Sequence, residues 1–177
     1  MKSVFLLTGT PGTGKTSLIK QVIVDCEINA GGFYTEEIRS QGTRTGFRLV
    51  TLDGDEATLA HVDFNKRFRV GKYGVDVDAL NSVGVAALRE AGRRCDLIVI
   101  DEIGKMEILS ADFRNIVRDL IGSGLKILGT IMLHADSQAD IIKIMPQVDV
   151  MILTRSNYNQ VLESVRKWLI TVKSPAV

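Results

Sequence analysis

The sequence predicts an α/β fold of three layers, in which helices cover both faces of a mostly parallel sheet. Short apolar runs alternate with stretches of helical periodicity over most of the chain, which is typical of right-handed β–α–β units. Residues 33–62 interrupt this alternation with strand patterns alone. Within them, Asp53-Gly54 is a strong hairpin signal, so we expect an antiparallel extension at one edge of the sheet.

In the first half of the chain, an apolar run predicts the opening strand, and apolar residues at helical spacing predict the helix after it. Strand patterns follow, and then a basic and aromatic stretch without a clean period. In order, we expect a strand over 4–7, a helix over 14–26, strands over 33–39, 47–52 and 57–62 with a polar loop over 41–45, and a loop over 64–78.

The second half returns to the alternation. Residues 96–100 form a short continuous apolar run, as expected for a strand covered on both faces. The last helix carries a single apolar stripe, and Ser156 or Asn157 is placed to cap it. In order, we expect a helix over 82–91, the strand 96–100, a helix over 111–121, a strand over 126–132, a helix over 138–144, a strand over 148–153 and a helix around 161–169.

Length and composition favour one domain over residues 1–170, followed by a frayed tail at 171–177. The 177 residues carry a net charge of +1, so nothing indicates nucleic acid or an anionic membrane as a partner. No apolar run approaches membrane-spanning length, and the first one leads into a glycine-rich loop rather than forming a signal peptide.

Two cysteines, Cys26 and Cys95, have no CxxC or metal-ligand spacing, which indicates buried thiols in a reducing compartment. We therefore expect a cytoplasmic protein. No residue decides the oligomeric state, and we expect a monomer.

Residues 9–16, GTPGTGKT, fit the pattern G-x-x-x-x-G-K-[ST] of a loop that cradles phosphates. Glycines let backbone N–H groups turn toward the phosphates, and the helix that follows offers its N-terminus to an anion. Lys15 is placed to reach the β- and γ-phosphates, and Thr16 to give its hydroxyl to Mg²⁺. The alternative is a glycine-rich turn without a ligand. The residues expected to bind nucleotide are Gly9, Thr10, Pro11, Gly12, Thr13, Gly14, Lys15, Thr16 and Ser17.

The strand at 96–100 runs into two acids, Asp101 and Glu102, which is the expected form of the acidic strand that accompanies a phosphate loop. We expect Asp101 to hold Mg²⁺ together with Thr16, and Glu102 to act as the base that polarises the attacking water. The alternative is a pair of acids that offset the dipole of a following helix.

Four stretches, with the spacing between them, resemble the small P-loop nucleoside-triphosphatase family that includes the human cancer-related nucleoside-triphosphatase and thermophile relatives. They are GTPGTGKT (9–16), GGFYTEEIR (31–39), VGKYGVDV (70–77) and DLIVIDEIGKMEI (96–108). The resemblance implies a RecA-like P-loop fold and slow hydrolysis of nucleoside triphosphates with broad base tolerance. The resemblance also implies that Lys105 and Glu107 are candidate site residues. The alternative is that they are an ordinary pair of surface residues.

Other polar residues follow strand ends, where ligands bind in such sheets. Glu36 is placed to contact the attacking water or a second substrate, or else is an exposed acid on an edge strand. Lys72 is placed to contact phosphate and Tyr73 to stack on a base, the alternative being a basic loop without contacts. Arg155 and Asn157 lie where a base or ribose edge is expected, although helix capping by Asn157 is the simpler account.

Two further expectations concern the γ-phosphate. If the strand at 126–132 lies between the phosphate-loop strand and the acidic strand, Thr130 faces that phosphate, with His134 as a weaker candidate. Arg39, Arg44 and Arg48 are expected on solvated strand faces rather than as an arginine finger.

The expected function is hydrolysis of ATP, GTP or another nucleoside triphosphate to diphosphate and phosphate with Mg²⁺. A nucleotide or small-molecule kinase is the first alternative, although the segment 132–144, where such kinases carry an arginine-bearing lid, contains no Arg. A nucleotide-dependent switch or binding module is the second alternative. Its guanine-reading N-K-x-D element is missing, because residues 65–68 read Asn-Lys-Arg-Phe.

Overall fold

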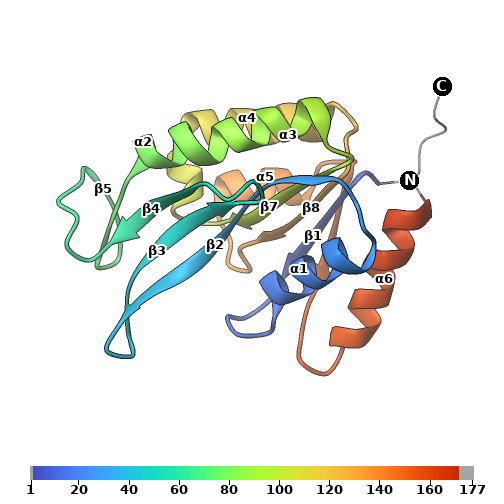
Figure 1. Cartoon of the computed structure of the whole chain (residues 1–177), viewed down its shortest axis with the longest axis horizontal. Coiled ribbons are helices and arrows are strands. Elements are labelled where there is room, and N and C mark those ends of the chain that lie inside the picture. Colours follow the sequence, from blue (N-terminus) through green and yellow to red (C-terminus); the bar gives the residue numbers. More distant parts are fainter. Residues whose placement is uncertain (1, 172–177) are drawn as a thin grey trace.

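A nine-stranded sheet runs through residues 2–171, the part of the chain that the computed structural model describes (Figure 1). Its strand order is β5-β6-β4-β3-β2-β7-β8-β1-β9. The strands are β1 (Val4–Thr8), β2 (Ala30–Ser40), β3 (Thr43–Thr51), β4 (Glu56–His61), β5 (Phe68–Val70), β6 (Tyr73–Val75), β7 (Leu97–Ile103), β8 (Ile127–Ile131) and β9 (Val148–Ile152). The predicted α/β fold with a mostly parallel sheet and an antiparallel extension is therefore confirmed.

The parallel half of the sheet consists of the first half of β2 and of β7, β8, β1 and β9. In this half β8 lies between β1 and β7, which is the arrangement under which we expect Thr130 to face the γ-phosphate. All of these strands run in the same direction, so the loops after β1, β7 and β8 meet at one edge of the sheet.

The antiparallel half consists of the second half of β2 and of β3 to β6. The Asp53-Gly54 hairpin is present: Thr51 N donates to Asp55 O at 2.8 Å, and Gly54 has a φ of 100°. The polar loop predicted over 41–45 is only a tight turn, because β3 already begins at Thr43. The loop predicted over 64–78 is wrong, since it contains β5 and β6, and β6 pairs with the distant β4.

Helices cover both faces of the sheet (Figure 1). The helices α1 (Lys15–Asp25) and α6 (Tyr158–Thr171) pack on one face around Phe5, Leu7 and Val99. On the other face lie α3 (Ala86–Arg94), α4 (Ala111–Gly122) and α5 (Ser137–Lys143), around Phe33 and Phe113. Each face thus has its own apolar core, as a sheet covered on both sides requires.

The helix predicted over 82–91 is longer than expected. A short α2 (Val77–Ala79) and a π-helical segment η1 (Leu80–Val85) lead directly into α3, so one helical run begins at residue 77. Asp76 caps this run by accepting a hydrogen bond from Ala79 N at 3.0 Å.

Three expectations about the rest of the chain can be checked only within residues 2–171. No helix there is long and apolar enough to cross a membrane. Cys26 and Cys95 are free thiols there, but half-buried rather than fully buried. The tail expected at 171–177 lies outside the described residues except for Thr171, which ends α6. The division into a domain and a tail stays a prediction.

Candidate functional site

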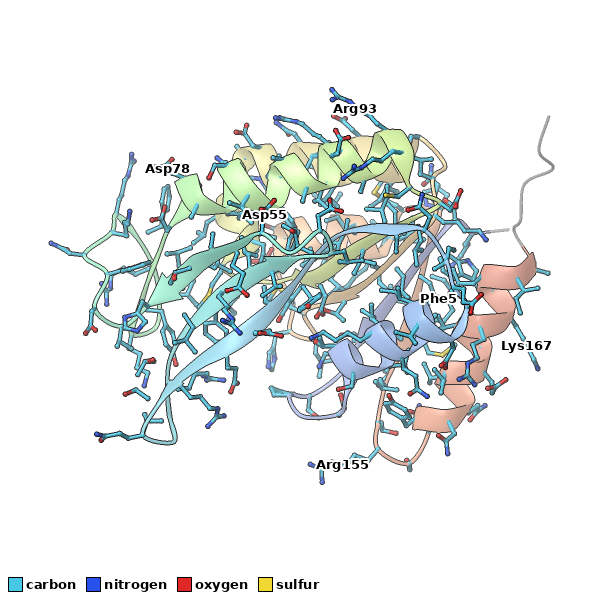
Figure 2. All side chains as sticks on the ribbon, viewed as in Figure 1. Phe5, Asp55, Asp78, Arg93, Arg155 and Lys167 are labelled. Atoms are coloured by element: carbon cyan, nitrogen blue, oxygen red, sulfur yellow. The ribbon has the colours of Figure 1, made fainter. Side chains whose placement is uncertain are left out.

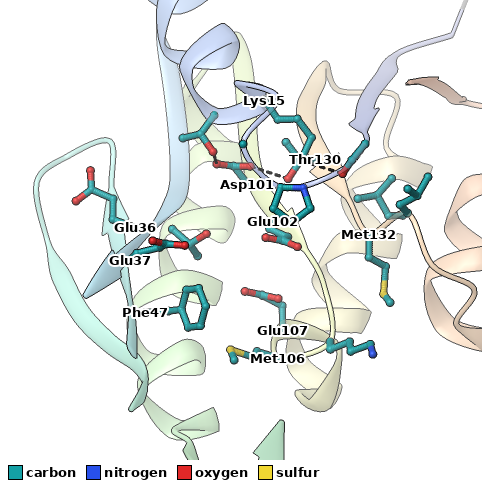
Figure 3. Close-up of a pocket in the computed structure, with 18 of the residues that line it drawn as sticks. Lys15, Glu36, Glu37, Phe47, Asp101, Glu102, Met106, Glu107, Thr130 and Met132 are labelled. Atoms are coloured by element: carbon teal, nitrogen blue, oxygen red, sulfur yellow. Dashed lines mark hydrogen bonds between the residues drawn. The ribbon is translucent and has the colours of Figure 1, made fainter. Parts of the chain in front are cut away.

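A cavity of about 570 Å³ opens at the edge where β1, β7 and β8 end, and it extends under the antiparallel half of the sheet. Lys15, Asp101 and Thr130 lie at one end, which we call the phosphate end (Figure 3). Glu102 lies in the middle of the cavity, and Phe47 lies at the opposite end (Figure 3).

The loop over residues 9–14 connects β1 to α1 and forms one wall of the phosphate end. Gly9 has a φ of 148°, and a Cβ at this position would lie 2.4 Å from Leu153 O, so the chain passes too close to its neighbour for any side chain. Gly14, with a φ of 92°, immediately precedes α1 and has no side chain to cap it. The first turn of α1 thus has no side-chain cap and lines the cavity, where its free N–H groups could bind an anion.

Lys15 is held inside the curve of this loop. Its Nζ donates hydrogen bonds to Gly9 O at 3.0 Å and to Thr10 O at 3.1 Å. The ammonium group is therefore already at the centre of the loop, where phosphate oxygens would offer it stronger, charged acceptors.

Asp101 in β7 joins α1 and β8 into one hydrogen-bonded unit. Its Oδ2 accepts from the Thr16 hydroxyl and its Oδ1 from the Thr130 hydroxyl, both at 2.6 Å. The carboxyl group is buried, and this burial raises its pKa, while the hydrogen bonds from Thr130 and Thr16 oppose the rise. Thr130 is thereby placed beside the phosphate end, as expected.

Glu102 also reaches the cavity, although neighbouring residues of a strand normally point to opposite faces. A bulge in β7 explains this: Ile100 pairs with Gly129 and Ile103 with Ile131, so Asp101 and Glu102 both stand opposite Thr130 alone. The Glu102 carboxyl group touches solvent in the cavity, but the surrounding walls and the charge of Asp101 raise its pKa.

A second carboxyl group, that of Glu107, lies below Glu102 in the short 3₁₀ segment η2 (Glu107–Leu109) (Figure 3). Its Oε2 accepts a hydrogen bond from Gly104 N at 3.2 Å. Burial and the nearby Glu102 raise the pKa of Glu107 to about 8. A Cβ on Gly104 would lie 2.9 Å from Glu102 Oε1 and 3.1 Å from Glu107 Oε2, so both carboxyl groups approach the same side of Gly104.

Glu36 and Lys105 line the same cavity. Glu36 is not a lone acid, because it accepts from Lys20 at 3.2 Å and from Arg48 at 2.8 Å. The hydrogen bonds from Arg48 and Lys20 hold its pKa below the usual range, which makes it a poor proton acceptor. Lys105 is exposed at the cavity wall. His134 also lines the wall and is exposed.

The structure corrects the expectations for Lys72 and Tyr73, neither of which lines the cavity. Tyr73 is buried; its ring packs edge-on against Phe47 at 5.3 Å, and its hydroxyl accepts from Arg44 at 3.1 Å. It is therefore part of the core and has no free face for a base. Lys72 is exposed, with its Nζ 5.5 Å from the Tyr73 ring centroid.

Arg155 and Asn157 also lie outside the cavity. Arg155 is exposed and projects away from the sheet in the loop between β9 and α6 (Figure 2). The Asn157 side chain accepts from Thr154 N at 2.8 Å and donates to Ile152 O at 2.9 Å, which secures the start of α6. These two bonds hold the loop before α6, and helix capping by Asn157 stays a prediction, because neither bond reaches an N–H group of α6.

The residues that sequence reasoning missed are the apolar ones at the far end of the cavity. They are Phe47, Leu59, Val70 and Met106, with Met132 on the wall after β8. Arg44, expected on a solvated strand face, also lines this part and is paired with Glu37 at 2.8 Å. No motif marks these positions, because an apolar cavity wall and an apolar core have the same sequence pattern.

Comparison with known proteins places these observations in a family. Residues 4–166 match a family model described as NTPase. The chain is 45% identical over 161 residues to the nucleoside-triphosphatase THEP1 of Thermotoga petrophila, and the match covers 90% of this chain and 89% of that protein.

Two solved structures are similar in fold. The crystal structure of THEP1 from Aquifex aeolicus has a TM-score of 0.84 at 34% identity, covering 94% of this chain and 98% of the other. The solution structure of a human cancer-related nucleoside triphosphatase has a TM-score of 0.79 at 35% identity and covers both chains completely. These similarities span the phosphate loop, the acidic strand and the antiparallel half alike.

Proposed function

The chain belongs to this nucleoside-triphosphatase family and hydrolyses nucleoside triphosphates. We propose that the reaction requires Mg²⁺ and releases nucleoside diphosphate and phosphate. The observation that supports this most directly is the Thr16–Asp101–Thr130 unit next to Lys15, with Glu102 beside it. Each of the groups that phosphoryl transfer needs has a candidate here.

The oxygen donors at the phosphate end suit Mg²⁺. Asp101 supplies a buried carboxylate and Thr16 a hydroxyl 2.6 Å away from it. Within residues 2–171, no group of three or more His, Cys, Asp or Glu side chains is arranged to hold a metal by itself. This fits Mg²⁺, which is commonly held by one or two protein oxygens together with phosphates and waters. When bound, Mg²⁺ neutralises charge on the phosphate oxygens.

The chain's own residues bind and orient the triphosphate. The N–H groups of the loop over 9–14 and of the first turn of α1 donate to phosphate oxygens. The Lys15 ammonium exchanges its bonds to Gly9 O and Thr10 O for bonds to the β- and γ-phosphates. These donors are fixed before the reaction, so they stabilise the charge that develops on the transferring group.

Glu102 accepts the proton of the attacking water. Its raised pKa makes the carboxylate a stronger base than a glutamate in free solution, and it lies in the middle of the cavity, next to the phosphate end (Figure 3). Glu36 is the less suitable base because Lys20 and Arg48 already engage its carboxylate.

Two isosteric variants separate the roles of the adjacent acids. Glu102→Gln keeps the size and loses the basic carboxylate, so kcat should fall by about 10²–10⁴-fold while Mg²⁺-dependent nucleotide binding survives. Asp101→Asn should instead weaken the Mg²⁺ dependence of binding, because its charge is needed near the cation before the reaction as well.

The measurements are nucleotide affinity with and without Mg²⁺ and single-turnover phosphate release, for both variants in parallel. Normal turnover by Glu102→Gln would remove it as the base and make Glu36 the next candidate. An identical defect of Mg²⁺-dependent binding in both variants would show that the two acids do not have separate roles.

A further inference from the structure

The cavity is larger than hydrolysis needs. A water molecule that attacks the γ-phosphate occupies little space, whereas the cavity continues past Glu102 to Phe47 and Met106 (Figure 3). The total volume of about 570 Å³, part of which the phosphates occupy, falls in the range typical of sites that enclose small organic molecules.

The walls of this far end are apolar. Phe47 comes from β3, Leu59 from β4 and Val70 from β5, while Met106 follows β7. Phe47 and Met106 are only half-buried, so part of their surface faces the cavity rather than the core. An apolar wall gains free energy from an apolar occupant and gains none from water.

Glu102 stands between the two ends, so a molecule in the apolar end and a γ-phosphate at the phosphate end would meet at its carboxylate (Figure 3). A hydroxyl group on that molecule would have the place, and the same base, that we assign to the attacking water. The position therefore suits a second nucleophile.

Charge limits what this second molecule can be. Glu37, Glu102 and Glu107 are carboxyl groups in the lining of the cavity. Arg44 is already engaged, with Nη1 2.8 Å from Glu37 Oε1 and Nε 3.1 Å from the Tyr73 hydroxyl. The pKa of about 8 leaves the Glu107 carboxyl group neutral near pH 7, and Glu37 is paired with Arg44. The Glu102 carboxylate is then the group that would repel an anionic acceptor, so an uncharged acceptor is favoured.

We infer that the apolar end of the cavity is an acceptor subsite for a small, uncharged alcohol carrying an apolar ring, to which the enzyme transfers the γ-phosphoryl group in competition with water. This inference rests on the proposed function, because both reactions use the same phosphate end and the same base.

In the transfer step, the alcohol oxygen displaces the nucleoside diphosphate from the γ-phosphorus. The hydroxyl proton of the alcohol passes to the Glu102 carboxylate as the alcohol oxygen bonds to the γ-phosphorus. The bond from that phosphorus to the β–γ bridging oxygen breaks, and its electron pair leaves with the nucleoside diphosphate. The products are nucleoside diphosphate and a phosphate monoester of the alcohol.

The test follows labelled γ-phosphate from ATP with Mg²⁺ in the presence of ring-bearing primary alcohols, namely benzyl alcohol, 3-pyridylmethanol and 2-naphthylmethanol. Glycerol serves as a polar alcohol and benzoate as a charged ring. We expect at least one ring alcohol to give a labelled phosphate monoester whose formation saturates with alcohol concentration, with a matching decrease in labelled inorganic phosphate. Glycerol should give no saturable ester, and benzoate should not reduce phosphate release.

Variants of the apolar end give the second measurement. Phe47→Ala should lower the ester-to-phosphate ratio at least tenfold while water hydrolysis continues. Met106→Ala is a parallel variant at the same end, in case Phe47→Ala does not fold. Phe68→Ala is the matched control, since Phe68 is exposed in β5 and does not line the cavity.

Label found only in inorganic phosphate at every alcohol concentration, with normal hydrolysis, overturns the acceptor subsite and leaves the proposed function intact. The acceptor subsite is also overturned if ester forms in proportion to alcohol concentration and equally from glycerol. Such ester would come from alcohol that enters an open site as solvent, without a binding subsite. An unchanged ester-to-phosphate ratio in folded Phe47→Ala and Met106→Ala enzymes would likewise overturn the acceptor subsite. Failure of the proposed function is distinct, because phosphate release without any acceptor would then survive in Glu102→Gln.

Discussion

The parallel and antiparallel halves of the sheet build the two ends of one cavity by different means. The parallel half contributes backbone N–H groups and short polar side chains that are fixed by neighbouring strands, such as Asp101 between Thr16 and Thr130. The antiparallel half contributes apolar side chains, such as Phe47, and a salt-bridged surface around Glu36 and Glu37. The first kind of surface suits the phosphates that all nucleoside triphosphates share; the second suits a particular partner molecule.

The largest effect should come from the parallel half. Lys15→Ala removes the ammonium group from the centre of the phosphate loop, so kcat/KM should fall by about 10²–10³-fold, or roughly 2.7–4 kcal/mol of transition-state stabilisation. The far-ultraviolet circular dichroism spectrum should not change. Lys167→Ala, at an exposed position on α6, is the control and should have wild-type kinetics. Wild-type phosphate release by a folded Lys15→Ala enzyme would contradict the assignment.

The junction between the halves should be the next most sensitive point. Gly32 lies in the part of β2 that pairs with β7, one residue before pairing with β3 begins at Phe33. It has a φ of 113°, and a Cβ there would lie 2.1 Å from Val99 O. Gly32→Ala should therefore destabilise the fold by about 2–3 kcal/mol, measured by urea unfolding. The control is Gly54→Ala, where φ is 100° but no atom lies within 4 Å of the added Cβ, so a similar loss in both variants would exclude the clash as the cause.

A pH effect should come from Glu107, which lies below Glu102 in the cavity (Figure 3). With a native pKa of about 8 and an unfolded value near 4.5, native Glu107 keeps its proton between these pH values while the unfolded chain loses it. The free energy of unfolding should then decrease by up to about 1.4 kcal/mol per pH unit from pH 5 to pH 8. Glu107→Gln should remove that part of the slope. Parallel pH profiles of unfolding for the two proteins would show that Glu107 is not protonated in the native state.

The smallest effect concerns the base of the nucleotide. If binding energy resides mainly in the phosphate end, ATP, GTP, CTP and UTP should have kcat/KM values within about tenfold, or roughly 1.4 kcal/mol. Steady-state phosphate release with each nucleotide gives the comparison. A preference of more than about a hundredfold would reveal a base pocket outside both ends described here.

The parallel half was largely predictable from the sequence, because its strands are continuous apolar runs and its site residues stand in spaced motifs. The prediction for Thr130 depended on β8 lying between β1 and β7, an order that the sequence left open and the structure supplies. The antiparallel half was less predictable: β5 and β6 have three residues each and depend on pairing with β4, which no local pattern records. Tyr73 was misjudged for the same reason, since its burial depends on Phe47 and Arg44.

Two features of the site depend on detail that a single sequence does not contain. The bulge in β7 brings Asp101 and Glu102 to the same side, against the usual alternation of a strand. Glu107 lies close to Glu102 only because η2 folds back beneath β7 and Gly104 leaves the space between them. The acidic strand made Glu102 a candidate and the family resemblance made Glu107 one, but neither indicated that the two side chains lie close together.

The open sheet leaves β5 and β9 as edge strands, each with a row of backbone groups that another chain's strand could pair with. β5 is only three residues long and carries Arg69, and Lys66 and Arg67 lie just before the strand. β9 has Asp149 near its centre, half-exposed and paired with Lys2 at 3.5 Å. A strand added at either edge would have to strip water from these charges, so the sheet resists edge-to-edge aggregation without needing to close into a barrel.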